Sequence, residues 1–121
     1  MKLFMMLGAL AGFSGVAFGA FGAHALKTRL SPEMLTIFNT GVLYHLVHAL
    51  ALIAAAWSVD RFPDGLGHIA GWAFFIGILV FSGSLYALAI SGVRILGAIT
   101  PIGGIAFLVG WFALFWTAFK G

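Results

Sequence analysis

The chain has 121 residues, of which 63% are hydrophobic and only 7% are charged, and its formal net charge is +3. Soluble domains are about 45–50% apolar and about 25% charged, so this composition excludes a water-soluble fold and indicates an integral membrane protein. The absence of cysteine excludes disulfides and thiolate sites, and the dispersed basic residues exclude a nucleic-acid-binding block.

Four long apolar segments predict four membrane-spanning helices, because one span needs about 20 mostly apolar residues. The predicted spans cover residues 3–23, 41–57, 66–90 and 95–119. A membrane β-barrel would instead show alternating segments of about 10 residues. We therefore expect an all-α, antiparallel up-down four-helix bundle that forms a single domain over residues 1–121, with both termini on one side. The first apolar run is longer than the usual core of about 7–15 residues in a cleaved signal peptide, so we expect it to be retained.

The first span carries a stripe of glycines, which recur at steps of four, three, four and three residues: Gly8, Gly12, Gly15, Gly19 and Gly22. This spacing places them on one helix face. Missing side chains let another helix backbone approach closely, which favours association in lipid. The stripe predicts helix packing inside the bundle, and a homodimer seam is the alternative.

The first connection ends in a helix-start signal. Ser31 is expected as the N-cap, Pro32 at the first helical position and Glu33 near the positive helix end. These residues open a short amphipathic lead-in before the second span. The third connection covers only residues 91–94, which predicts an antiparallel hairpin of the last two helices.

The distribution of basic residues does not determine which way the protein is oriented in the membrane. Three basic residues flank the spans on each side: Lys2, Arg61 and Lys120 on the side of the termini, and Lys27, Arg29 and Arg94 on the other. The positive-inside rule therefore gives no preference.

The start of the fourth span contains Pro101 and the pair Gly103–Gly104. A proline and two glycines can kink or break a helix that lines a cavity. Alternatively, Pro101 marks the first turn of a regular helix, where proline is favoured.

Polar side chains gather in the half of the bundle away from the termini. The candidates for a polar cluster or ligand pocket are His24, Tyr44, His45, His48, Ser82, Ser84, Tyr86 and Thr100. Polar groups within a membrane must face protein or water. His45 and His48 are three residues apart and are expected to share a helix face.

Three interpretations of this cluster stay open. It is a structural hydrogen-bond network, a small-molecule or ion pathway, or a metal, haem or quinone site. No Asp or Glu lies inside a span, which disfavours a carboxylate-based proton-coupled exporter. A zinc site needs at least three protein ligands, and only two of the candidate ligands share a helix. Our leading expectation is therefore no metal and no cofactor.

The motifs GAFGAHALK, FNTGVLYHLVHALAL, FSGSLYAL and GAITPIGGIAFLVGW resemble those of domain of unknown function family 423, whose animal relatives include transmembrane protein 256. The matching residues are Gly19, Gly22, His24, Lys27, Thr40, Gly41, Tyr44, His48, Ser82, Gly83, Ser84, Tyr86, Thr100, Pro101, Gly103 and Gly104. The resemblance implies a four-span bacterial inner-membrane protein, and it supplies no activity.

We therefore expect a non-enzymatic accessory, assembly or structural subunit that packs with lipid, in a larger membrane complex or a homo-oligomer. A small transporter or channel is one alternative, and a metal-, haem- or quinone-binding protein is another. An enzyme is disfavoured, because a catalytic histidine usually needs an acid to orient it and Glu33 lies in a connection.

Overall fold

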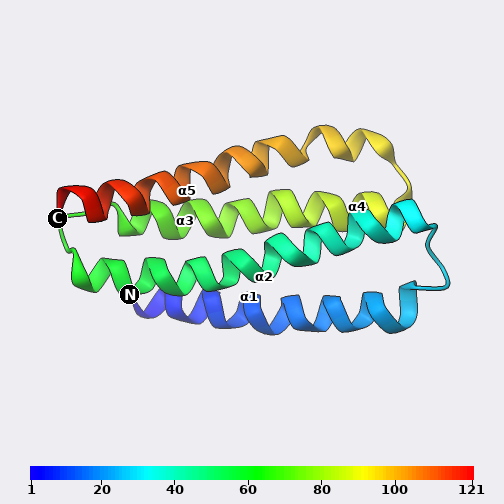
Figure 1. Cartoon of the computed structure of the whole chain (residues 1–121), viewed down its shortest axis with the longest axis horizontal. Coiled ribbons are helices and arrows are strands. Elements are labelled where there is room, and N and C mark those ends of the chain that lie inside the picture. Colours follow the sequence, from blue (N-terminus) through cyan, green and yellow to red (C-terminus); the bar gives the residue numbers. More distant parts are fainter.

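A computed structural model describes all 121 residues, and every regular element in it is helical. The elements in chain order are α1 (Lys2–Phe21), the π-helical turn η1 (Gly22–Leu26), α2 (Pro32–Arg61), α3 (Gly67–Gly77), the π-helical turn η2 (Ile78–Ser82), α4 (Gly83–Ser91), the 3-10 turn η3 (Arg94–Ala98) and α5 (Thr100–Lys120). Together, α3, η2 and α4 form one continuous rod (Figure 1).

Four rods are long and apolar enough to cross a membrane, and they span Lys2–Leu26, Pro32–Arg61, Gly67–Ser91 and Arg94–Lys120. They alternate in direction, and the two chain termini lie at the same end (Figure 1). The predicted four-span, all-helical architecture is therefore confirmed. The short third connection also forms the expected hairpin, with Gly92 in the left-handed region at φ 73°.

The second span is longer than predicted. It begins at Pro32 rather than at Gly41, so the expected amphipathic lead-in is the first part of α2 and not a separate element. The side chain of Ser31 caps this helix by accepting a hydrogen bond from the backbone N–H of Met34 at 3.2 Å, as predicted. At 1.5 Å per residue the helix is about 45 Å long, which exceeds a hydrocarbon layer of about 30 Å. Its ends therefore project beyond the apolar layer.

The rods lie side by side in the order α1, α2, α3–α4 and α5 (Figure 1). Of the most apolar stretch of each inner rod, 50% is buried in α2 and 44% in the α3–α4 rod. In each outer rod only 22% of that stretch is buried. The outer helices α1 and α5 therefore present most of their surface to the surroundings. In a bilayer, this surface faces lipid or another protein.

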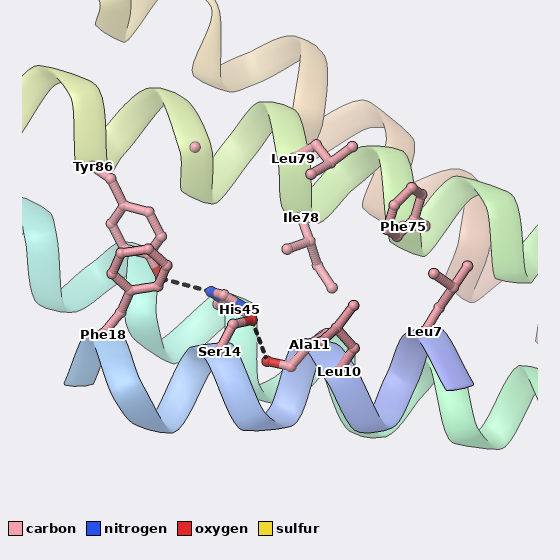
Figure 2. A pocket seen from close by; sticks show the side chains of 11 residues that line it. Leu7, Leu10, Ala11, Ser14, Phe18, His45, Phe75, Ile78, Leu79 and Tyr86 are labelled. Atoms are coloured by element: carbon pink, nitrogen blue, oxygen red, sulfur yellow. Dashed lines mark hydrogen bonds between the residues drawn. The ribbon is translucent and has the colours of Figure 1, made fainter. Parts of the chain in front are cut away.

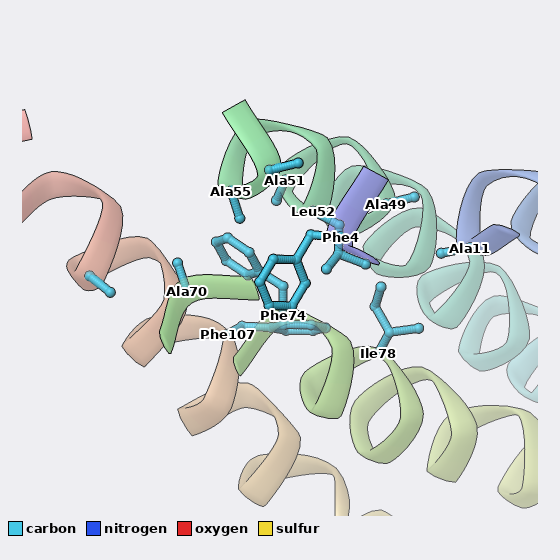
Figure 3. Packing of buried hydrophobic residues seen from close by; sticks show 12 residues of the cluster. Phe4, Ala11, Ala49, Ala51, Leu52, Ala55, Ala70, Phe74, Ile78 and Phe107 are labelled. Atoms are coloured by element: carbon cyan, nitrogen blue, oxygen red, sulfur yellow. The ribbon is translucent and has the colours of Figure 1, made fainter. Parts of the chain in front are cut away.

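The main apolar core lies between α2, α3 and α5, with Phe4 of α1 reaching into it (Figure 3). Phe74 is fully buried at its centre, beside Phe107. Small residues of α2 belong to the same core and let the helices approach: Ala49, Ala51, Ala55 and Ala56. The pairing of large rings with alanines and glycines gives the close packing that holds helices together in lipid.

The glycine stripe packs against α2, as the first interpretation predicted. A Cβ atom at Gly8 would lie 2.8 Å from Cγ1 of Ile53, and one at Gly15 would lie 2.7 Å from Cδ2 of Leu46. Gly19 and Gly22 also face α2. Gly12 differs, because nothing lies within 4 Å of the position of its Cβ.

The start of α5 is regular. Pro101 lies in the first helical turn and the helix runs unbroken through Gly103 and Gly104 to Lys120. The second interpretation of this segment is therefore supported, and the helix is not broken there. The role of Gly103 is close approach, since a Cβ there would lie 2.7 Å from the Cα of Phe81 in η2.

Candidate functional site

The expected polar cluster is divided among several helix pairs. His24 does not join it, because its side chain is exposed on the π-helical turn η1. Tyr44 is 39% exposed. Its ring packs on Phe81, while its backbone carbonyl, rather than its hydroxyl, holds His48. The eight candidate residues therefore do not all converge on one cluster.

His45 forms the only side-chain hydrogen-bond chain that joins three helices. Its Nδ1 lies 2.8 Å from the hydroxyl of Tyr86 on α4, and its Nε2 lies 3.1 Å from Oγ of Ser14 on α1. Oγ of Ser14 is also 3.1 Å from the carbonyl oxygen of Ala11. Figure 2 shows this chain of contacts, with His45 rising from α2 between the two other helices. We call Ser14, His45 and Tyr86 the relay.

Two proton arrangements satisfy the relay. In the first, Tyr86 donates to Nδ1 of His45, Nε2–H donates to Ser14, and Ser14 donates to the carbonyl of Ala11. In the second, Ser14 donates to Nε2, and Nδ1–H donates to the oxygen of Tyr86. The tyrosine hydroxyl is then an acceptor toward its surroundings in the first arrangement and a donor in the second, because each hydroxyl carries one proton.

His48 is fixed in a single neutral tautomer. Its Nδ1 lies 2.7 Å from the carbonyl oxygen of Tyr44, and its Nε2 accepts from the indole N–H of Trp111 at 2.9 Å. A carbonyl only accepts and an indole only donates, so the proton must sit on Nδ1. The imidazole also stacks on Phe107, with ring centroids 3.5 Å apart. These contacts give His48 a role in fastening α2 to α5.

The remaining predicted hydroxyls fasten other helix pairs. The buried Ser82 donates to the carbonyl of Gly41 at 2.7 Å, which joins η2 to α2. The hydroxyls of Ser84 and Thr100 lie 2.6 Å apart, which joins α4 to the start of α5. Hydroxyl bonds of this kind connect helices where lipid offers no alternative partner.

Three residues of this network were not among the predicted ones. Ser14 is the one hydroxyl in the first predicted span, and that isolation is a usable signal. Trp111 carries an indole N–H deep in the last span, which requires a partner. Thr117 accepts from the backbone N–H of Leu66 at 2.8 Å and so fixes the second connection to α5. Nothing in the local sequence indicates this last contact.

The predicted interface charges are exposed. Lys27 and Arg29 lie in the first connection, and Arg94 forms an ion pair with Glu33 at 2.8 Å. Glu33 occupies the first turn of α2, which projects beyond the apolar layer. There the hydrogen bond from Arg94 and its charge lower the pKa of the Glu33 carboxyl. This pair links the start of α2 to the start of η3. No three His, Asp or Glu side chains lie close enough together to hold a metal ion.

Comparison with known proteins finds one matching family and relatives that are similar over nearly the whole chain. The family described as "protein of unknown function (DUF423)" matches residues 18–104. The UPF0382 membrane protein YwdK of Bacillus subtilis is 45% identical over 122 residues, which cover 99% of this chain and 98% of the relative. A UPF0382 membrane protein of Haemophilus influenzae is 43% identical, over 97% of this chain and 94% of the relative. No solved structure matches.

The resemblance inferred from the four motifs is therefore confirmed. Both the relatives and the four membrane-length helices show a bacterial multi-pass membrane protein. The chain belongs to the DUF423 (UPF0382) family of membrane proteins.

Proposed function

We propose that the protein is a non-enzymatic accessory or assembly subunit that packs its outer helices against lipid and other membrane proteins. The observation that carries this proposal is the use of its internal polar groups. Every buried side-chain nitrogen and oxygen has a hydrogen-bond partner within the chain. The bonds of His48, Ser82 and Ser84 each join two different helices. Such a network supports a rigid scaffold.

The surface that a partner would meet is on the outer helices. On α5, four exposed aromatic side chains pack on one another along the helix: Phe112, Phe115, Trp116 and Phe119. We call these four residues the aromatic ridge. Aromatic residues are enriched in protein interfaces, since they bury a large area with few rotatable bonds. The ridge is therefore the preferred contact surface in this proposal.

Native isolation tests the proposal. The tagged protein, expressed at its natural level, is extracted from its own membranes in a mild detergent, and the protein mass of the particle is measured by light scattering. We expect a particle with more protein mass than one chain. The variant Phe115→Ala should reduce the assembled fraction. Phe13→Ala is the matched control, because Phe13 is an exposed phenylalanine on the opposite outer helix α1. A strictly monomeric wild-type particle without partners would refute the proposal.

A further inference from the structure

A cavity of about 400 Å³ separates α1 from the α3–α4 rod. This volume is within the range of about 300–1,000 Å³ that is typical of small-molecule sites. The cavity runs along α1 from Leu7 to Phe18, which corresponds to about 16 Å at 1.5 Å per residue. Figure 2 shows that the facing wall comes from the other rod, including Ile78 and Leu79 of the π-helical turn η2. Turns of this kind are frequent at functional sites.

The polar side chains of the cavity are those of the relay. Figure 2 shows them toward one end, whereas apolar side chains surround the other end near Leu7 and Phe75. The polar end therefore suits an oxygen-bearing headgroup and the apolar end suits a hydrocarbon tail. The aromatic rings of Phe18 and Tyr86 pack on each other at the polar end, with centroids 4.8 Å apart and planes 28° apart, and they form one aromatic wall there.

The depth of the relay restricts the headgroup. Ser14 lies at the middle of the first rod, twelve residues from Lys2 and twelve from Leu26. It is therefore about 18 Å from either end of that rod. A charged phospholipid headgroup belongs to the interface and is costly at this depth. The headgroup at the relay must be neutral and must belong to a molecule that dissolves in the hydrocarbon layer.

The two proton arrangements of the relay further restrict which headgroup can bind. Tyr86 presents an acceptor in one arrangement and a donor in the other. The switch moves the ring proton of His45 from one nitrogen to the other and redirects the Ser14 hydroxyl proton from the carbonyl of Ala11 to Nε2, both of which lie 3.1 Å from Oγ. The site can therefore bind a hydroxyl or a carbonyl at the same position. His48 has no such freedom, since both of its partners are fixed in role.

We propose that this cavity binds a membrane-soluble quinone or its quinol, with a ring oxygen against the hydroxyl of Tyr86 and the tail along α1 toward Leu7. A quinone presents a carbonyl and a quinol presents a hydroxyl at the same ring position, which matches the two arrangements of the relay. Binding requires no reaction within this chain. It goes beyond the proposed assembly role and stands independently of it.

Photolabelling of the protein in phosphatidylcholine nanodiscs tests this inference. The probe is an azido-substituted ubiquinone with a decyl tail, and the labelled peptides are mapped by mass spectrometry. We expect labelling near Ser14 and Tyr86. An excess of decylubiquinone, or of its quinol, should reduce it about tenfold. Decylbenzene, which has the same tail and a ring without oxygen, should reduce it less than twofold.

Three variants sharpen the test. Gly83 lines the cavity, and a Cβ there would meet nothing within 4 Å. Gly83→Leu should therefore fill the space without disturbing the fold and reduce labelling about tenfold. Gly12→Leu is the matched control, since Gly12 also has open space but does not line this cavity; it should label like the wild type. Tyr86→Phe keeps the ring, loses the hydrogen bond to the ligand together with the one to His45, and should label about fivefold less.

Several results would overturn the inference. These are labelling spread over all lipid-facing helices, equal competition by decylbenzene, and undiminished labelling of Gly83→Leu. Equal competition by decylbenzene would identify the cavity as a site for hydrocarbon chains alone. The comparison of the two competitors uses only the wild-type protein, so it holds even where a variant fails to fold.

Discussion

The adjacent glycines at the start of α5 give a sharp test of the packing. A Cβ added at Gly103 would lie 2.7 Å from the Cα of Phe81, whereas ordinary contacts of a Cβ begin at 3.4 Å. The obstacle is backbone, and the nitrogen of Phe81 lies closer still than its Cα, so Gly103→Ala must move α5 away from η2 by at least about 0.7 Å. A Cβ at Gly104 would lie 3.9 Å from the ring of Phe81, which is an ordinary contact.

We expect Gly103→Ala and Gly104→Ala to affect the free energy of unfolding differently. Overpacking of this kind costs about 1–3 kcal/mol, and it acts against the gain of up to about 1 kcal/mol from replacing a helical glycine by alanine. We expect Gly103→Ala to lower the free energy of unfolding by about 1–2 kcal/mol. Gly104→Ala meets no obstacle and should leave it unchanged or raise it by up to about 1 kcal/mol.

The measurement is reversible unfolding from mixed micelles by increasing the mole fraction of dodecyl sulfate, followed by circular dichroism. The two variants carry the same substitution at neighbouring positions, so changes in composition and expression are matched. Equal stability of the two variants would refute the packing of α5 on η2 described above. So would a loss of stability in Gly104→Ala alone.

Three further changes test the hydrogen bonds between helices. Ser82→Ala removes the bond to the Gly41 carbonyl and should lower the free energy of unfolding by about 1 kcal/mol in the same titration. Trp111→Phe leaves Nε2 of the buried His48 without its donor. It should cost about 1 kcal/mol, and nitrogen NMR should show the signal of that Nε2 moving while its Nδ1 keeps the proton. Arg94→Gln removes an ion pair whose side chains are 70% and 59% exposed, so it should leave the unfolding curve unchanged at any salt concentration.

Several parts of the fold follow from local sequence signals. The four spans are visible because long apolar runs have no soluble counterpart. The start of α2 is visible because Ser31 and Pro32 act on their own helix end. The packing of α1 on α2 is visible in the spacing of its glycines, because that spacing is a property of one helix face. In each case the physical cause lies within a few residues along the chain.

Other parts depend on contacts between distant residues. The π-helical turn η2 lies in the segment ILVFS, which carries no breaker and only one polar residue, Ser82 at its end. The backbone of this turn meets α5 at Gly103, so the register of one helix is tied to a glycine on another. The contact of Thr117 with the second connection is also non-local, since its partner Leu66 is 51 residues away. Neither feature could be predicted from the local sequence.

The two histidines on α2 show why spacing alone misassigned the polar cluster. Residues three apart on a helix of 3.6 residues per turn differ by about 60° in direction, although they lie on one broad face. On an outer helix this difference would matter little, because both side chains would meet the same neighbour. On α2, which lies between α1 and the rods on its other side, 60° is enough to change the partner helix. His45 reaches Ser14 of α1 and Tyr86 of α4, whereas His48 reaches Trp111 of α5.

The consequence is a division of roles between neighbouring imidazoles. His48 meets one obligatory donor and one obligatory acceptor, so its contacts hold one tautomer and suit a purely structural role. His45 meets two hydroxyls, each of which can donate or accept, and it borders a cavity. A change of ligand at that cavity can therefore be answered by moving protons along the relay, without moving a helix. The adaptable histidine, His45, is the centre of the only hydrogen-bond chain that joins three helices, and the fixed one, His48, anchors α2 to α5.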